Sequence, residues 1–249
     1  MAQIEAAPGT EPARTLSDDV YLLAGLLGEV LQSSSGDRAF ALTEEARANA
    51  KALRGGDRAA GNALDAMVRN LSGDDAESLV RSFTNYFQLI NLAEDSERIR
   101  RIRAREMRVP GPRRGSVREA IGLLAERDVS AERLADLLRQ SQIRLVLTAH
   151  PTEARRRTII AKLARIFAIL RELDERSLTQ DEEARLQQRL AHTIEELWYS
   201  DEVRAVGLTV LDEVRTSLVY LLSTFVEVMP QIYRDLEAAL AEFYPDLHI

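Results

Sequence analysis

Cysteine is absent from this chain of 249 residues, and lysine and long uncharged runs are scarce. Without cysteine the chain can form no disulfide, no thiolate metal site and no cysteine nucleophile. Lysine occurs only at Lys51 and Lys162, so a covalent mechanism through a lysine amine has few candidates. No uncharged run, Thr216 to Val226 included, is long enough to span a bilayer, and we expect no membrane partner.

The charge balance is acidic, with a formal net charge of −7. This balance argues against a protein whose main function is to bind nucleic acid. The arginine-rich run 98–105 does not change that conclusion, because carboxylates interleave with it and indicate a solvated or interhelix ion-pair face. Residues 1–15 carry acidic residues and prolines without an apolar stretch, so they predict a disordered lead-in and no signal peptide. We therefore expect a cytoplasmic protein.

From residue 16 onward the hydrophobic pattern predicts helices almost throughout. Ser17 can cap a first helix that ends at a break over 33–36. Ser116 with Glu119 and Thr179 with Glu182 have the spacing of capping boxes, which predicts helix starts at both places. The expected helices after the first cover 38–54, 58–71, 73–107, a short stretch from Ser116, 130–140, and 152–229 with breaks near 177–179 and 206–209.

One segment, Ile143 to Ala149, differs from the rest of the chain because it is rich in branched residues. It places Ile143, Leu145 and Leu147 on one face, as a β-strand would. A lone strand is not stable by itself, and no other segment is expected to pair with it. The sequence therefore predicts a mainly α fold with one strand whose partners come from elsewhere.

His150 follows this strand directly and precedes a helix with a buried stripe that includes Ile159 and Leu163. Backbone N–H groups at a helix start attract anions, and the same field keeps an imidazole neutral and able to accept a proton. A neutral base beside a bound phosphate can act as a catalytic unit. The alternative is a histidine in a turn that only caps the helix.

Three arginines follow in the first turn of that helix. Helical spacing places Arg155 and Arg156 near the edge of the buried stripe, whereas Arg157 points away from it. Burying such charges is costly without partners, so anions or carboxylates are expected beside them. Alternatively, both side chains extend to solvent along a surface groove.

The run Val146–Glu153, with Arg156, Arg157, Thr158 and Lys162 after it, resembles the signature around the catalytic histidine of phosphoenolpyruvate carboxylases. The segments 86–94, 198–204, 212–215 and 230–240 are similar in order and spacing to other parts of that family. One departure is Gly207–Leu208, where many members carry a proline-containing stretch. The resemblance covers nearly the whole chain and identifies 16–249 as the incomplete amino-terminal helical region of such an enzyme.

The resemblance implies a fold of long helices with one barrel-type β-strand, an incomplete piece of a helix-rich α/β barrel. It implies a carbon–carbon lyase that adds bicarbonate to phosphoenolpyruvate, giving oxaloacetate and phosphate and so supplying the tricarboxylic acid cycle. The histidine matching His150 handles the proton in that reaction. The family requires Mg²⁺, but its metal-binding carboxylates, mobile loop and second catalytic residue are expected beyond Ile249, so no metal ligand is expected in this chain. A homotetramer is expected for the full-length enzyme, and this piece is expected to be inactive alone.

In some members of the family, arginines matching Arg156, Arg157 and Arg204 form part of an anion site for an activating sugar phosphate. The resemblance therefore implies allosteric regulation through these residues. A different function also fits the same residues, namely a non-catalytic helical module that binds a phosphorylated ligand or a protein partner. Reading the gene past codon 249 distinguishes the two hypotheses.

Overall fold

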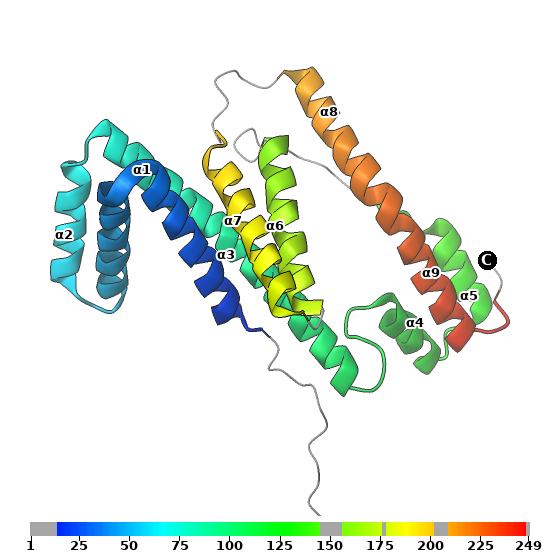
Figure 1. Ribbon diagram of the computed structural model, residues 1–249. Helices are drawn as coiled ribbons and strands as arrows, with labels where there is room; N and C mark the ends of the chain where they lie inside the picture. Colours follow the sequence, from blue (N-terminus) through cyan, green and yellow to red (C-terminus); the bar gives the residue numbers. More distant parts are fainter. Residues whose placement is uncertain (1–13, 145–155, 176–177, 202–208, 248–249) are drawn as a thin grey trace, which may run out of the picture. The chain divides into compact units, whose positions relative to one another are not determined.

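The computed structural model describes residues 14–144, 156–175, 178–201 and 209–247, and these are almost entirely helical (Figure 1). The elements in chain order are α1 (Leu16–Arg54), α2 (Arg58–Arg69), α3 (Gly73–Arg108), α4 (Val117–Glu126), α5 (Ala131–Gln140), α6 (Arg157–Glu175), α7 (Gln180–Trp198), α8 (Val210–Tyr220), the π-helical turn η1 (Leu221–Phe225) and α9 (Val226–Phe243). None of the described helices is both long enough and apolar enough to cross a membrane.

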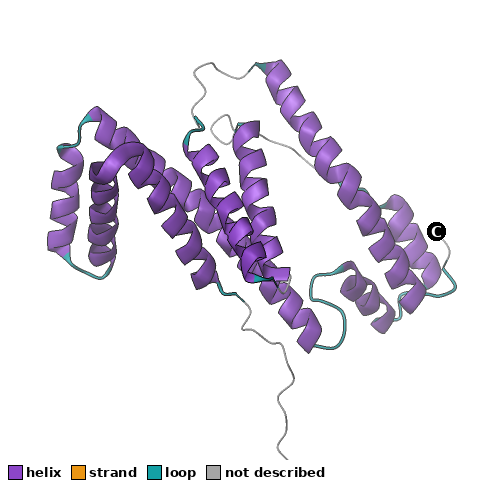
Figure 2. Cartoon of the chain, in the orientation of Figure 1, coloured by secondary structure: helices purple, strands orange, loops and turns teal. Residues whose placement is uncertain are grey.

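The prediction of one barrel-type strand is wrong for the part of the chain that the structure describes, which contains helices and no strand or sheet (Figure 2). Ile143 and Arg144, the first two residues of the expected strand, have no regular secondary structure. Residues 145–149 lie outside the described residues. A strand needs a neighbouring strand for its backbone N–H and C=O groups, and no other described segment provides one. The mainly α part of the prediction is correct.

In helix α1, the predicted N-cap is wrong and the predicted break is confirmed. Its N-cap is Thr15 and not Ser17: the Thr15 hydroxyl accepts from the Asp18 N–H, and the Asp18 carboxylate accepts from the Thr15 N–H at 2.8 Å. The predicted break is confirmed at Gly36, whose φ of 83° and ψ of 171° are not helical. Glycine adopts this φ without steric cost because it has no Cβ. The predicted lead-in 1–15 falls mostly on residues 1–13, which lie outside the described ones.

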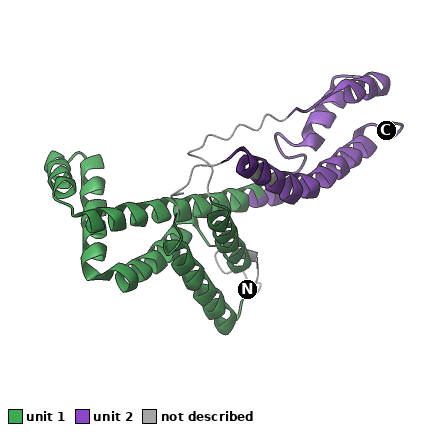
Figure 3. Cartoon of the chain, turned by 90° about the horizontal axis from the view of Figure 1, so that it is seen from above, with its two compact units in different colours: residues 1–102, 155–204 green, residues 103–154, 205–249 purple. Residues whose placement is uncertain are grey.

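The chain divides into two compact units, which we describe separately (Figure 3). Unit 1 contains residues 1–102 and 155–204, and unit 2 contains 103–154 and 205–249. The core of unit 1 is built from one face each of α1, α3, α6 and α7 and includes Leu23, Leu27, Leu89, Ile159, Ile166, Ile169, Leu170, Leu190, Ile194, Leu197 and Trp198.

Unit 2 has a much smaller core at the C-terminal end of α9. Its buried cluster is formed by Ile121, Leu134, Ala239, Leu240 and Tyr244. The Tyr244 hydroxyl donates to the Val129 carbonyl at 3.0 Å, and Arg118 on α4 forms two hydrogen bonds to Glu242 on α9, at 2.6 and 2.7 Å. These contacts join α4, α5 and α9 at one end of the unit.

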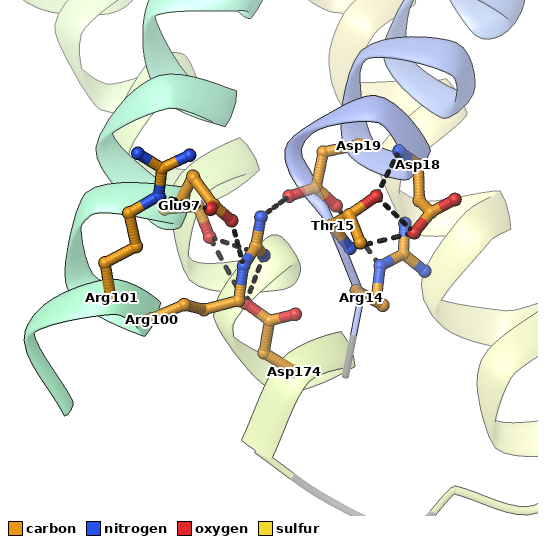
Figure 4. Close-up of polar contacts among 9 residues, drawn as sticks. Arg14, Thr15, Asp18, Asp19, Glu97, Arg100, Arg101 and Asp174 are labelled. Atoms are coloured by element: carbon orange, nitrogen blue, oxygen red, sulfur yellow. Dashed lines mark hydrogen bonds and ion pairs between the residues drawn. The ribbon is translucent and has the colours of Figure 1, made fainter. Parts of the chain in front are cut away.

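A partly buried ion-pair network connects three helices of unit 1 (Figure 4). Arg100 on α3 donates to Asp19 on α1 and to Asp174 on α6, each at 2.7 Å. Asp19 is only 1% exposed. Burial lowers the pKa of the Arg100 guanidinium, but its hydrogen bonds to Asp19 and Asp174 raise that pKa by more, so the group stays charged. Arg100 thus neutralises carboxylates from two different helices, which also fits the predicted interhelix ion-pair face.

We expect Arg100→Ala to lower the free energy of unfolding by about 3–5 kcal/mol, because it leaves the buried Asp19 and the half-buried Asp174 without their main partner. Arg101 is the matched control, since its side chain is 76% exposed and binds Glu97 on the same helix. Arg101→Ala should cost less than about 1 kcal/mol, as expected for a surface ion pair. Urea unfolding of both variants measures the difference, and equal effects would contradict the structural role given to Arg100.

Candidate functional site

In the sequence, the residues predicted for the site flank the start of α6 and the end of α7. His150, Arg155 and Arg204 fall outside the described residues, so the structure does not test whether they come together. Arg156 and Arg157 are described, at the N-terminal end of α6. The site is therefore described below from the two helix ends that adjoin these residues in the sequence, the start of α6 and the end of α7.

The N-terminal end of α6 exposes its two arginines to different degrees. Arg157, the first residue of α6, is exposed, whereas Arg156 is half-buried, as the helical spacing predicts. The Arg156 carbonyl accepts from the N–H groups of Ile159 and Ile160, at 3.0 and 3.1 Å, and Ile159 is 2% exposed. The buried stripe predicted for this helix is thus present. It anchors the helix in the core of unit 1 and fixes the position of its N-terminal end, where unpaired N–H groups attract anions.

Lys162, on the second turn of α6, caps the C-terminal end of α7. Its ammonium donates to the Glu196 carbonyl at 2.7 Å and to the Ser200 hydroxyl, which in turn donates to the Glu196 carbonyl. Carbonyls in the last turn of a helix lack backbone partners, and a cation there also interacts favourably with the helix dipole. The side chain therefore joins the beginning of one helix to the end of the next.

Arg81 on α3 holds the same end of α7 from a second direction. Its guanidinium donates to the Trp198 carbonyl at 3.0 Å and lies 6.0 Å from the centre of the Trp198 ring. It also lies 3.8 Å from the Asp201 carboxylate. Trp198 is 3% exposed and belongs to the buried core of unit 1. Two cations thus fix the chain just before the segment that contains Arg204.

An open hollow lies between α6 and α7 beside Lys162. It is lined by Lys162, His192, Glu195, Glu196 and Tyr199. Two carboxylates stand against one lysine that is already hydrogen-bonded to the end of α7, so the hollow is a poor site for an anion. The arginine-rich start of α6 has the better charge for a phosphate.

A divalent metal has no evident ligands in the part of the chain that the structure describes. No group of three or more histidine, aspartate or glutamate side chains there could hold a metal ion. The described residues therefore do not fit Mg²⁺, which takes carboxylate and water ligands in octahedral geometry. None of the roles proposed for the described residues involves a metal ion.

Comparison with known proteins identifies the family to which the chain is related. A family model described as phosphoenolpyruvate carboxylase matches residues 16–249. The chain belongs to the phosphoenolpyruvate carboxylase family. It is 43% identical over 236 residues to a phosphoenolpyruvate carboxylase of Thermus thermophilus, a match that covers 94% of this chain and 26% of that relative. The resemblance inferred from the sequence is thereby confirmed.

Other relatives in the phosphoenolpyruvate carboxylase family are matched over a similar share of their length. The enzyme of Roseiflexus castenholzii is 37% identical over 235 residues, covering 92% of this chain and 25% of the relative. The enzyme of Nitrosomonas europaea is 35% identical over 226 residues, and the match covers 90% of this chain and 24% of that relative. The chain thus spans about a quarter of the length of the curated relatives that it matches.

Lys162 and Arg81 are the site residues to which the sequence analysis assigned no role. Lys162 was recognised only as part of a family signature, and nothing in the sequence around Arg81 indicates a partner at Trp198. The two contacts join residues that are 34 and 117 positions apart. Local pattern and spacing carry no signal for contacts of this kind.

We expect Lys162→Met to lower the free energy of unfolding by about 1.5–3 kcal/mol, because it removes charge-assisted hydrogen bonds and keeps a side chain of similar length. Amide hydrogen exchange should rise selectively in the last turn of α7. The control is Lys51→Met at the other lysine of the chain, which is exposed and should change stability by less than about 0.5 kcal/mol. Unchanged exchange at residues 196–201 would show that Lys162 does not cap α7.

Proposed function

We propose that this chain contributes to an enzyme that carboxylates phosphoenolpyruvate with bicarbonate, giving oxaloacetate and phosphate. The observation that carries the proposal is the family match over residues 16–249. The relatives named above are phosphoenolpyruvate carboxylases about four times the length of the matched segment, which is 26% of the Thermus thermophilus enzyme. The reaction is therefore assigned to the full-length carboxylase, in which this segment is one part.

In the proposed reaction, bicarbonate attacks the phosphoryl group to form carboxyphosphate and an enolate. Carboxyphosphate then breaks down to CO₂ and phosphate, and the enolate takes up the CO₂. His150 handles the proton as general base and acid. The described start of α6 supports this role, because a helix N-terminus seven residues further along the chain favours a bound anion and a neutral imidazole. Mg²⁺, which neutralises charge on phosphate groups when bound, would take its ligands from parts of the enzyme that this chain does not cover.

The remaining properties of the family enzyme are proposed on the same basis. We propose a cytoplasmic, allosterically regulated homotetramer that supplies oxaloacetate to the tricarboxylic acid cycle and has no nucleic-acid or membrane partner. The net charge of −7 supports the part of this proposal that concerns nucleic acid.

The catalytic proposal predicts that His150→Asn lowers oxaloacetate formation by about 10²–10⁴-fold when the segment is joined to the rest of a carboxylase. Asparagine is close to histidine in size but cannot accept the proton, so the variant should stay folded. His192→Asn is the matched control, because His192 is an exposed residue of α7 and should leave activity unchanged. Full activity of His150→Asn would refute the role of His150. An inactive wild-type assembly that still binds phosphate would instead favour the non-catalytic module.

We also propose that Arg156, Arg157 and Arg204 bind the phosphate of an activating ligand. The exposure of Arg157 at a helix N-terminus supports this proposal, because guanidinium groups and helix N–H groups both bind phosphate oxygens.

This proposal predicts that Arg157→Gln weakens binding of inorganic phosphate by about tenfold or more, measured by isothermal titration calorimetry, because one charge-assisted contact is lost. Arg185→Gln removes another exposed arginine, on α7, and should leave phosphate binding unchanged. Equal weakening by both substitutions would indicate a general charge effect and no site at Arg157.

A further inference from the structure

The helical stretch formed by α8, η1 and the first half of α9 carries an unusual amount of exposed apolar surface. Half of all the large hydrophobic side chains that are exposed among the described residues lie between Val210 and Tyr233. Leu222 is 67% exposed and Val226 is 63% exposed. The uncharged run Thr216 to Val226 falls within this stretch. We call residues 210–233 the apolar helix face.

The small core of unit 2 does not cover the apolar helix face. The buried cluster of this unit and the side chains packed against it involve α9 only from Leu236 onward, together with residues of α4 and α5. Figure 1 shows α4 and α5 beside the C-terminal end of α9, while α8 extends beyond them. A helix that is apolar on most sides belongs to a protein interior, and a large exposed apolar patch marks an interaction surface.

The backbone of the same stretch departs from regular helix. Residues Leu221–Phe225 form a π-helical turn, and Pro230 lies inside α9. Proline has no N–H, so it cannot donate to the Val226 carbonyl, which would be its helical acceptor. π-Helical turns occur frequently at functional sites. Both irregularities fall within the apolar helix face and give it a shape that a regular helix would not have.

We propose that the apolar helix face is the docking surface for the part of a phosphoenolpyruvate carboxylase that this chain does not cover. In the Thermus thermophilus relative the matched segment is 26% of the protein, so about three times as much chain accompanies it. That additional chain is large enough to provide a complementary apolar surface, which the small core of unit 2 does not. The inference rests on the family relationship and goes beyond the proposed catalytic function.

The absence of cysteine from the chain makes the docking surface directly measurable. A single Leu222→Cys substitution reports on the apolar helix face, and Gln188→Cys, at an exposed position of α7, is the control. In the dilute 249-residue chain, we expect both thiols to react with a maleimide at similar rates. Co-expression with the rest of the Thermus thermophilus carboxylase should slow labelling of Leu222→Cys at least tenfold and change that of Gln188→Cys less than twofold.

A binding measurement with charged variants provides the second arm of the experiment. The affinity-tagged wild-type chain should retain the co-expressed carboxylase remainder, as should Gln188→Glu. Leu222→Glu should lose it, because a carboxylate would be buried in an apolar interface.

Three outcomes would overturn the proposal. In the first, the Leu222→Cys thiol is already protected from the maleimide in the dilute chain. In the second, protection appears only when the concentration of the 249-residue chain alone is raised. In the third, the wild-type chain does not retain the co-expressed carboxylase remainder. The second outcome would assign the face to a second copy of this chain. Neither arm measures carboxylation, so an inactive complex that protects Leu222→Cys would count against the catalytic proposal alone.

Discussion

The position of the candidate site depends on the half-buried charge of Arg100 and its carboxylate partners. Three helices, α1, α3 and α6, place a guanidinium and two carboxylates in contact at 2.7 Å inside unit 1. Desolvating such charges is strongly unfavourable unless their partners are well placed, so the three helices can pack in few other registers. Apolar contacts alone would allow a helix to slide or rotate at lower cost. The network fixes α6, and with it the arginines at the beginning of α6.

Most of the helices could be predicted from the sequence because their signals are local. The periodic apolar residues, the Thr179 and Glu182 capping box and the break at Gly36 all act within a few residues. The cap of α1 was missed because serine and threonine are both good N-caps, and the sequence has one of each, at Ser17 and Thr15. The distinguishing signal is Asp18, which stands three residues after Thr15 and completes a capping box with it. The expectation of a strand was wrong in the described part of the chain for a different reason. Branched residues favour extended backbone, but a strand also requires a partner strand.

The candidate site was predictable to the extent that it is linear in the sequence. His150 and the arginines after it stand in one continuous signature, and the family relationship could be recognised from it. The contacts that hold the site in place are not linear. Lys162 reaches the end of α7, and Arg81 reaches the same end from α3, so their roles appear only when the helices have packed. Within the arginine-rich run, likewise, only the fold distinguishes the half-buried Arg100 from the exposed Arg101.

The two units obtain their stability from different sources. Unit 1 encloses a large apolar core with a neutralised charge network inside it, so its helix ends are positioned by its own contacts. Unit 2 encloses a small core and exposes much of its apolar surface on α8 and α9. Free energies of local opening follow the amount of buried apolar contact, so α8 should open more easily than α6. Covering the apolar helix face would therefore stabilise unit 2 far more than unit 1, and the docking proposed above couples the ordering of α8 to assembly of the carboxylase.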